Sequence, residues 1–278
     1  MCRDCDGTGQ APAKIHAIFG TYLFPGKTYD DILATKGLKG EKNLYTRAKQ
    51  CVFAILYGGE SYTLINRGGI DEETAIICYE RWCEEHQVWS AERAKIYDMF
   101  CSMRQPGGIG TNVEWHDPCD YIESMFGFKR YFTLENRIVK CLFDLASDPP
   151  KEWAALPIKV VRRDRVQYAS GAVRSALYAA AFAIQASNMR AAGNHVIQSA
   201  GAQATKALQC EIWEIQPAGI GDWFVKLINI HDEVMAVTKP IYSKQVETIA
   251  YSFTDKLKEK VPLVGIDWSS AMKSWAEK

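Results

Sequence analysis

Two adjacent acidic residues near the end of the chain are placed to hold a metal ion. Asp232 and Glu233 follow His231, and β-prone, mainly apolar runs flank them at 224–230 and 234–237. Such runs on either side of a polar motif predict two β-strands joined by a short connection. Carboxylate oxygens at this connection could bind a hard cation such as Mg²⁺. An ordinary polar turn between two strands has the same pattern, so the motif needs support from elsewhere.

A second pattern lies far upstream, on a segment with helical periodicity. Lys49, Phe53 and Tyr57 are spaced four residues apart and would share one stripe of a helix, which Gly58 would end. This combination suits a nucleotide, because an ammonium group can bind phosphate oxygens while an aromatic ring packs against a sugar or base. An amphipathic core helix whose lysine reaches solvent would look the same.

Together with two further segments, these motifs resemble family-A DNA polymerases, the family of bacterial DNA polymerase I and many phage replicases. The helical stripe is similar to the nucleotide-binding helix of the fingers, and the acidic motif is similar to a metal-binding motif of the palm. Arg190, Asn194 and Gln198 are similar to the helix that tracks the template-primer duplex, and 126–130 is similar to the glycine-basic segment before it. The matches are collinear over nearly the whole chain.

The resemblance implies how a deoxynucleoside triphosphate (dNTP) would be bound. Lys49 would neutralise the triphosphate, and Phe53 would pack against the sugar and disfavour dideoxynucleotides. Tyr57 would stack beside the new base pair, while Gly58 would allow the fingers to close. Arg47, two residues before the lysine, is a further candidate for nucleotide binding.

The resemblance also implies the roles of the acidic motif and of the duplex helix. Asp232 would ligate Mg²⁺ directly, with two ions in a complete site, and Glu233 would lie in the outer shell. Together with Lys49 they are the expected catalytic residues. His231 would touch the primer terminus. The duplex helix would contact template phosphates and base edges without sequence specificity.

The chain departs from the family at one position of the nucleotide-binding helix. The family usually carries an arginine four residues before the lysine, where this chain has Tyr45. Arg47 does not simply replace it, because two residues rotate a side chain by about 200° around a helix. Which cation binds the terminal phosphates is left open.

A second acidic ligand is expected but not found. In the family it lies upstream of the segment that 14–24 resembles, and here Asp4 and Asp6 stand in a cysteine-glycine leader without strand-forming residues. Two-metal phosphoryl transfer needs at least two acidic ligands. We therefore expect a split polymerase, inactive alone, whose second polypeptide supplies the first catalytic aspartate and the thumb. An expression fragment or an inactive remnant is the alternative.

Composition places the chain among globular proteins. It has 278 residues, of which 47% are hydrophobic and 24% charged, and no apolar stretch is long enough to cross a membrane. A net charge of zero gives no hint of nucleic-acid binding. The nine cysteines and the lack of a signal-peptide core indicate free thiols in the cytoplasm of a bacterium or a phage-infected host.

The predicted fold is α+β, with helical fingers and a partial palm that contains a small antiparallel sheet. Helices are expected from about 42 to 57, with breaks from an N-cap at Asp71 to about 104, from 172 to 192, after a break at Gly193 from about 194 to 215, and from 243 to 259. A last strand is expected at 263–267. The predicted divisions are a cysteine-containing leader, a mainly helical fingers part, an insertion or irregular connection, and the palm: 1–13, 14–130, 131–178 and 179–278.

Three other functions fit parts of the sequence. A single-subunit RNA polymerase shares a similar fingers helix and palm. A polymerase-derived module could bind DNA without catalysis. A zinc-dependent interaction protein would use Cys2 and Cys5 with His116 and Cys119, although only the first two have the spacing of a local zinc knuckle.

Overall fold

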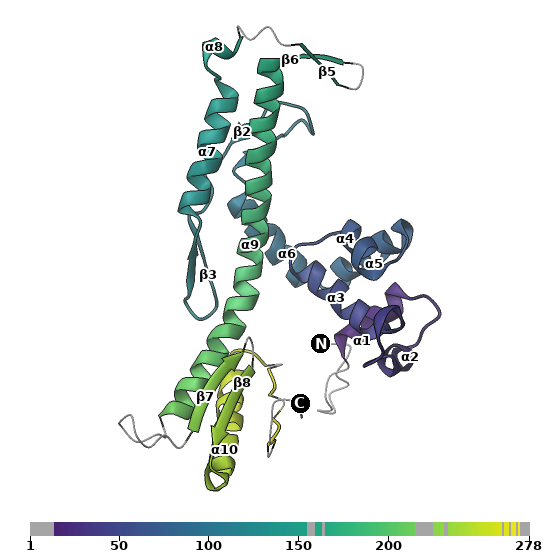
Figure 1. Cartoon of the computed structure of the whole chain (residues 1–278), viewed down its shortest axis with the longest axis vertical. Coiled ribbons are helices and arrows are strands. Elements are labelled where there is room, and N and C mark those ends of the chain that lie inside the picture. The colour runs from purple at the N-terminus through teal and green to yellow at the C-terminus, as the bar shows by residue number, and fades with distance from the viewer. Residues whose placement is uncertain are drawn as a thin grey trace. The chain divides into compact units, whose positions relative to one another are not determined.

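The computed structural model describes residues 14–154, 159–162, 165–214, 225–230, 233–262, 264–266, 268–270 and 272. The chain divides into two compact units, and each is described by itself. The first comprises Met1–Ile122 and Lys129–His195, and the second comprises Glu123–Phe128 and Val196–Lys278. Helices dominate and the strands form small antiparallel sheets, which confirms the predicted α+β class (Figure 1).

The first unit begins with short helices around one apolar core. The core includes the buried side chains of Phe19, Val52, Leu64 and Trp82. The elements that contribute to this part are α1 (Ile15–Leu23), α2 (Tyr29–Ala34), η1 (Gly40–Lys42), α3 (Leu44–Leu56), α4 (Ser61–Gly68), α5 (Glu72–Glu85) and α6 (Gln87–Phe100).

Side-chain caps fix where these helices start. The Asn43 side chain accepts a hydrogen bond from the backbone N–H of Thr46, so α3 begins close to the predicted position. Asp71 caps α5 in the same way through the N–H of Thr74, as predicted. The helix α4, between them, was not predicted. It is short and ends at Gly69, which has a positive φ of 60°.

The chain from α6 onward is more regular than expected. The predicted helix to about residue 104 ends at Phe100, and β1 (Met103–Arg104) then pairs with β2 (Glu114–Trp115) across the proline-glycine segment. The buried side chain of Gln185 holds β1 in place. Its Oε1 accepts from the N–H of Met103 at 2.6 Å, and its Nε2 donates to the same residue's carbonyl at 3.2 Å.

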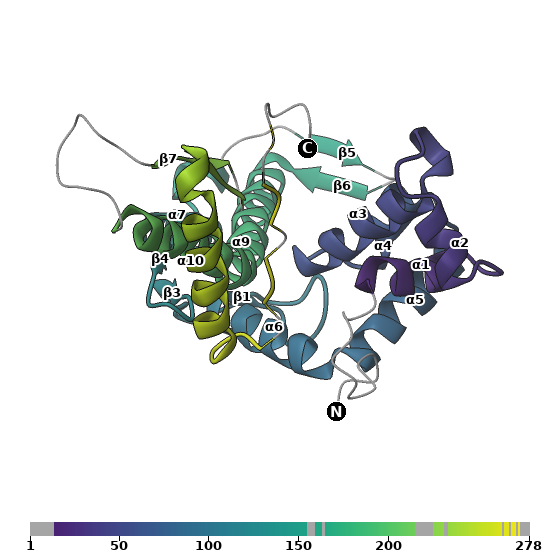
Figure 2. The same ribbon diagram turned by 90° about the horizontal axis from the view of Figure 1, so that it is seen from below.

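The stretch expected to be an irregular connection also contains regular elements. It holds α7 (Thr133–Ser147), α8 (Lys151–Ala154), β5 (Lys159–Arg162) and β6 (Arg165–Tyr168). Figures 1 and 2 show α7 running beside the first half of α9 (Ala169–Trp213). Val139 of α7 and Ala181 of α9 share a buried cluster with Met103. The α7 part of this stretch therefore packs into a core.

The predicted helix break at Gly193 is wrong, because α9 is continuous from Ala169 to Trp213. A glycine inside a helix costs only about 1 kcal/mol relative to alanine. The alanine-rich sequence around it favours helix, and Ala192 and His195 on either side of it are buried. These local and packing contributions exceed the cost of one glycine.

The second unit packs a hairpin and a helix against the end of α9. In it β7 (Val225–Ile230) pairs antiparallel with β8 (Glu233–Thr238), as predicted, and α10 (Pro240–Lys258) follows. Leu208 and Ile212 of α9 pack with Val246 and Ala250 of α10. The described residues 264–266 form no strand, so the predicted last strand is not found there.

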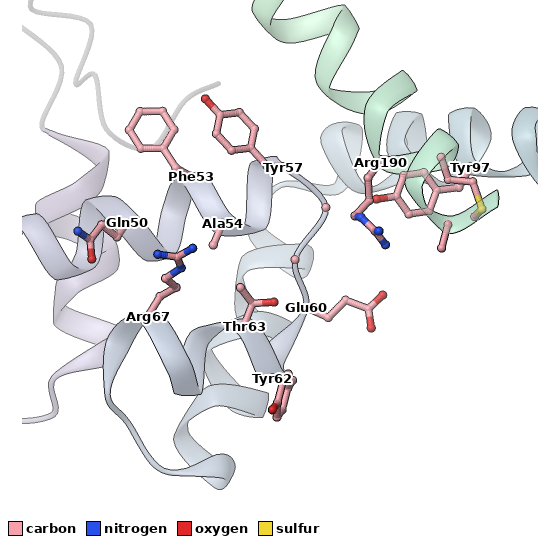
Figure 3. Close-up of a pocket in the computed structure, with 14 residues that line it drawn as sticks. Gln50, Phe53, Ala54, Tyr57, Glu60, Tyr62, Thr63, Arg67, Tyr97 and Arg190 are labelled. Atoms are coloured by element: carbon pink, nitrogen blue, oxygen red, sulfur yellow. The ribbon is translucent and has the colours of Figure 1, made fainter. Parts of the chain in front are cut away.

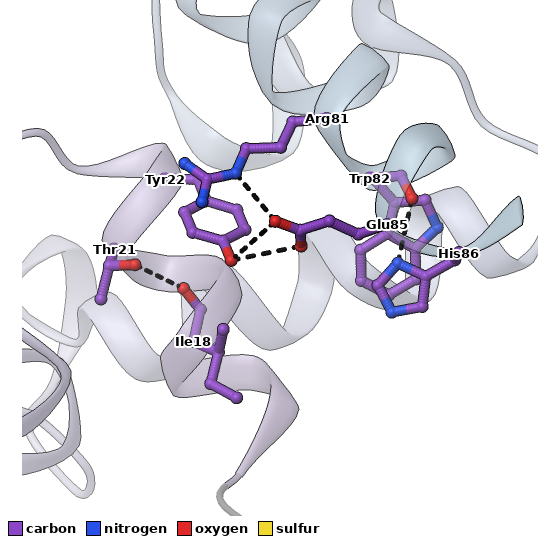
Figure 4. A network of polar contacts seen from close by, with 7 residues as sticks. All are labelled: Ile18, Thr21, Tyr22, Arg81, Trp82, Glu85 and His86. Carbon is purple, nitrogen blue, oxygen red and sulfur yellow. Dashed lines mark hydrogen bonds and ion pairs between the residues drawn. The ribbon is translucent and has the colours of Figure 1, made fainter. Parts of the chain in front are cut away.

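A polar network connects α1 to α5 (Figure 4). The Tyr22 hydroxyl donates to both carboxylate oxygens of Glu85 at 3.2 Å, and Arg81 donates to Glu85 at 2.9 Å while its guanidinium stacks 3.7 Å from the Tyr22 ring. The Trp82 and His86 rings stack beside them with centroids 3.9 Å apart.

Among the described helices, none is both long and apolar enough to span a bilayer.

Candidate functional site

The helix α3 has a buried face and an aromatic, basic face. Ala48, Cys51, Val52 and Ile55 are at most 1% exposed and form the buried face. Burial raises the pKa of the Cys51 thiol to about 12, so this cysteine stays neutral. The other face carries four residues at intervals of four, which we call the α3 ridge: Tyr45, Lys49, Phe53 and Tyr57.

The ridge residues touch one another as the predicted stripe requires. The Phe53 and Tyr57 rings are stacked, with centroids 5.8 Å apart and planes 25° apart. The ammonium group of Lys49 lies 5.6 Å from the Phe53 centroid. Lys49 and Tyr57 are both exposed. The ridge therefore offers a flat aromatic surface beside a cation to any ligand in solvent.

His16 of α1 joins the ridge, although sequence reasoning gave it no role. Its ring centroid lies 5.6 Å from that of Phe53 and 5.9 Å from that of Tyr45. Burial, and then the positive charge of Lys49, lower the pKa of His16. Its Nδ1 atom is buried without a hydrogen-bond partner among the described residues. No spacing in the sequence connects α1 to α3, so only the fold reveals this neighbour.

Arg47 lies away from the ridge. Its guanidinium donates to the carbonyl oxygen of Gly68 and stacks over the Phe24 ring at 4.9 Å. It thereby binds a carbonyl in the last turn of α4, where a cation is favoured by the helix dipole. The structure does not bring Arg47 to Lys49, in agreement with the rotation expected between positions two residues apart.

A glycine turn and a buried arginine fix the end of the ridge. Gly58 has a φ of +89° and directly follows Tyr57. Arg93 of α6 donates to the Gly58 carbonyl at 3.3 Å and to the Tyr79 hydroxyl at 2.7 Å. The Arg93 side chain is only 12% exposed and pairs with Glu60 at 3.7 Å. The Arg93 guanidinium therefore stabilises the turn at Gly58.

A pocket of about 980 Å³ opens on the other side of this turn (Figure 3). Figure 3 shows Phe53 and Tyr57 projecting to one side of α3, with Thr63 and Arg67 of α4 on the other. Arg190 of α9 enters the same pocket. The residues that line it are Gln50, Phe53, Ala54, Tyr57, Gly58, Gly59, Glu60, Tyr62, Thr63, Arg67, Tyr97, Ala186, Met189 and Arg190.

The pocket brings together residues that sequence reasoning had separated or missed. Arg190 was predicted to contact a template and lies at this pocket, beside Gly58. Arg67, Tyr62 and Tyr97 were not predicted, and Arg67 and Tyr62 lie on the unpredicted helix α4. Two arginines beside several aromatic rings suit a ligand that has phosphates and bases.

The predicted duplex-tracking residues lie on the continuous helix α9. Arg190, Asn194 and Gln198 follow at intervals of four and so share one helical face. Arg190 and Gln198 are exposed. The Asn194 Oδ1 atom is buried without a hydrogen-bond partner among the described residues. The geometry agrees with the predicted face, and contact with DNA stays a prediction.

Only part of the acidic motif can be placed. Glu233 begins β8 and is the register partner of Ile230, and its carbonyl accepts from the Asn229 side chain at 3.1 Å. His231 and Asp232 lie outside the described residues, as do Cys2 and Cys5. Within the described ranges, no three His, Cys, Asp or Glu side chains form a group that could hold a metal.

Comparisons with known proteins find likenesses among solved structures. No family model matches the sequence, and no curated protein matches it at a significant level. Among solved structures, the chain is similar to the POL domain of Pol1 from M. smegmatis, determined in complex with DNA primer-template and dNTP. The TM-score is 0.38 and the identity 16%, over 86% of this chain and 30% of that one. The chain thus spans less than a third of that structure.

Proposed function

We propose that this chain forms the fingers and part of the palm of a DNA-directed DNA polymerase, a nucleotidyltransferase that binds its dNTP on the α3 ridge. The observation that supports this best is the stacked pair of Phe53 and Tyr57 with Lys49 beside it. The three side chains stand on a helix whose opposite face is buried, so the ridge is available to a ligand.

The order of groups along the ridge matches the order of groups in a nucleotide. Lys49 binds phosphate oxygens as a point charge. Phe53, one turn further along, packs against the sugar, and its lack of a hydroxyl disfavours dideoxynucleotides. Tyr57, beyond it, stacks beside the base. His16 packs against Phe53 from α1 and keeps the ring in position.

The pocket behind the glycine turn is assigned to the template strand. Arg190 and Arg67 bind its phosphates, and the exposed Tyr62 and the Tyr57 ring face a base. Asn194 and Gln198 extend this contact along α9, without sequence specificity. The ridge and the pocket share Phe53, Tyr57 and Gly58, so a templating base and an incoming nucleotide would be held by one turn of chain.

The acidic motif would hold the magnesium that the reaction needs. Carboxylates are the donors that Mg²⁺ prefers, and Asp232 with Glu233 supplies two of them. The bound ions would supply charge stabilisation for phosphoryl transfer. Asp232 acts as a direct ligand, Glu233 as its neighbour, and His231 contacts the primer terminus. We assign the other acidic ligand, and the thumb, to polypeptide outside these 278 residues.

Primer extension tests the proposal directly. The chain is assayed with a template-primer duplex, dNTPs and Mg²⁺, alone and together with the product of the adjoining reading frame. We expect extension in the mixture, abolished by Asp232→Ala and reduced at least tenfold by Lys49→Gln. Lys258 on α10 pairs with the exposed Asp255 among the described residues. Lys258→Gln is therefore the charge-matched control, and extension should be unaffected by it.

Three outcomes would contradict parts of the proposal. Robust extension by the chain alone would refute the need for a second polypeptide. Incorporation of ribonucleotides in preference to deoxynucleotides would identify an RNA polymerase. Duplex binding without extension in any mixture, or extension unaffected by Asp232→Ala, would leave only a non-catalytic DNA-binding module.

A further inference from the structure

A second lysine reaches the α3 ridge from the turn that follows α2. This residue is Lys36, whose ammonium group lies 5.8 Å from the centroid of the Tyr45 ring. Its neighbour Thr35 is tied to the start of α3, because the Thr35 hydroxyl accepts from the Tyr45 N–H at 3.0 Å and donates to the Ile32 carbonyl at 2.6 Å. The lysine therefore starts from a fixed point of backbone beside the ridge.

The ridge consequently carries two cations, each on an aromatic ring. Lys49 lies over Phe53 and Lys36 lies over Tyr45, and the His16 ring contacts both of these rings. The two rings belong to residues eight apart, about 12 Å along the helix axis. Within the described part of the chain neither ammonium group pairs with a carboxylate. Unneutralised charges of the same sign along one surface favour an extended anion.

Two backbone donors at the start of α3 are already used. The N–H of Tyr45 is bound by Thr35, and the N–H of Thr46 is bound by Asn43. We therefore expect side chains to hold an anion at this end of the ridge. Lys36 is the cation that the structure places against Tyr45, whose own side chain carries no charge.

We propose that Lys36 binds the terminal phosphate of the nucleoside triphosphate on the α3 ridge, with Tyr45 as its aromatic support. This inference rests on the function proposed above. It fills the position where the resembling polymerases have arginine and this chain has Tyr45. Phe53 binds the sugar and Lys49 the phosphate next to it, so the polyphosphate extends toward Tyr45 and its last group reaches Lys36.

Equilibrium dialysis with radiolabelled nucleotides tests the assignment without requiring catalysis. The full chain is measured with dATP, dADP and dAMP in the presence of Mg²⁺. Lys36→Gln should weaken dATP binding about tenfold, the size of one lost charge-assisted contact, and should leave dAMP binding within twofold. Lys39→Gln removes an equal charge from the same exposed segment and should change neither affinity.

Substitutions at Tyr45 separate support by the ring from support by its hydroxyl. Tyr45→Phe keeps the ring and should bind dATP within twofold of the wild type. Tyr45→Arg, made in the Lys36→Gln chain, should restore most of the lost affinity, because it returns a cation to the same end of the ridge.

The outcomes distinguish this inference from the proposed function. If the wild type binds dATP and Lys36→Gln binds it equally well, or loses dAMP binding to the same extent, the assignment of Lys36 is wrong while the ridge stands. If the wild type binds no nucleotide, with or without the partner polypeptide, the proposed function and this inference are both overturned.

Discussion

The glycine that ends α3 permits a quantitative test of how the ridge is held. Gly58 has a φ of +89°, a conformation that costs an L-residue about 1–2 kcal/mol. A Cβ at this position would also lie 2.4 Å from the Tyr97 hydroxyl oxygen and 2.9 Å from Cγ of Arg190. Overpacking of this kind typically costs about 1–3 kcal/mol more. Gly58→Ala should therefore lower the free energy of unfolding by about 2–5 kcal/mol.

Gly37→Ala is the matched control. Gly37 has almost the same φ, +92°, but a Cβ there would meet nothing within 4 Å. Only the backbone cost of about 1–2 kcal/mol should be seen. Urea unfolding followed by circular dichroism measures both variants, and the difference between them isolates the crowding at the end of the ridge.

A second substitution tests which atom causes the crowding. The Tyr97 hydroxyl makes no hydrogen bond of normal geometry among the described residues, although the Arg93 guanidinium lies 4.9 Å from the ring centroid. Tyr97→Phe by itself should therefore cost at most about 1 kcal/mol. In the Gly58→Ala background, Tyr97→Phe should recover about 1 kcal/mol of the lost free energy of unfolding. The reasoning is refuted if Gly58→Ala is no less stable than Gly37→Ala, or if Tyr97→Phe gives the same change in both backgrounds.

Further predictions concern other contacts of the site. Arg93→Met should lower the free energy of unfolding by about 2–3 kcal/mol, because it leaves two partly buried oxygens without their donor. The same change at the exposed Arg81 should cost less than about 1 kcal/mol in urea unfolding. The pKa of His16 is lowered by burial and then by Lys49, so the folded chain resists protonation of this group. The free energy of unfolding should therefore fall as the pH drops below about 6.5, and it should fall less in His16→Gln. NMR titration should show a higher pKa of His16 in Lys49→Gln. Gly193→Ala should raise the free energy of unfolding by up to about 1 kcal/mol, seen as a higher urea midpoint. The added Cβ would meet only a Tyr97 ring carbon, at 3.7 Å.

Signals that act within one turn of chain could be predicted from the sequence. Asp71 was predicted as an N-cap, and it binds the N–H group three residues ahead at the start of α5. The stripe from Lys49 to Tyr57 follows from helical periodicity alone, and its stacking geometry agrees with that prediction. The β-prone runs on either side of the acidic motif likewise predicted the pairing of β7 with β8.

Features that depend on packing could not be predicted in this way. The break at Gly193 was a local prediction, and the buried neighbours of that glycine outweigh it. The short helix α4 has weak signals of its own and is held by the buried Leu64 and by Arg47 of α3. For the same reason Lys36 and His16 could not be assigned to the ridge, because contacts between different helices bring them there.

The division of α3 into two faces also explains why its sequence favours a ligand over extra stability. The buried face uses small and apolar side chains that are at most 1% exposed, and it would hold the helix in place without help. On the other face Phe53 and Tyr57 stack on each other, although Tyr57 remains 36% exposed. Lys49 lies beside them and forms no ion pair with a carboxylate of the described residues. Acidic or small polar residues at the ridge positions would expose less apolar surface to water. With such a residue in place of Lys49, no positive charge there would oppose protonation of His16. In the proposed function, a bound polyphosphate would neutralise the cation and a flat base would cover the exposed ring.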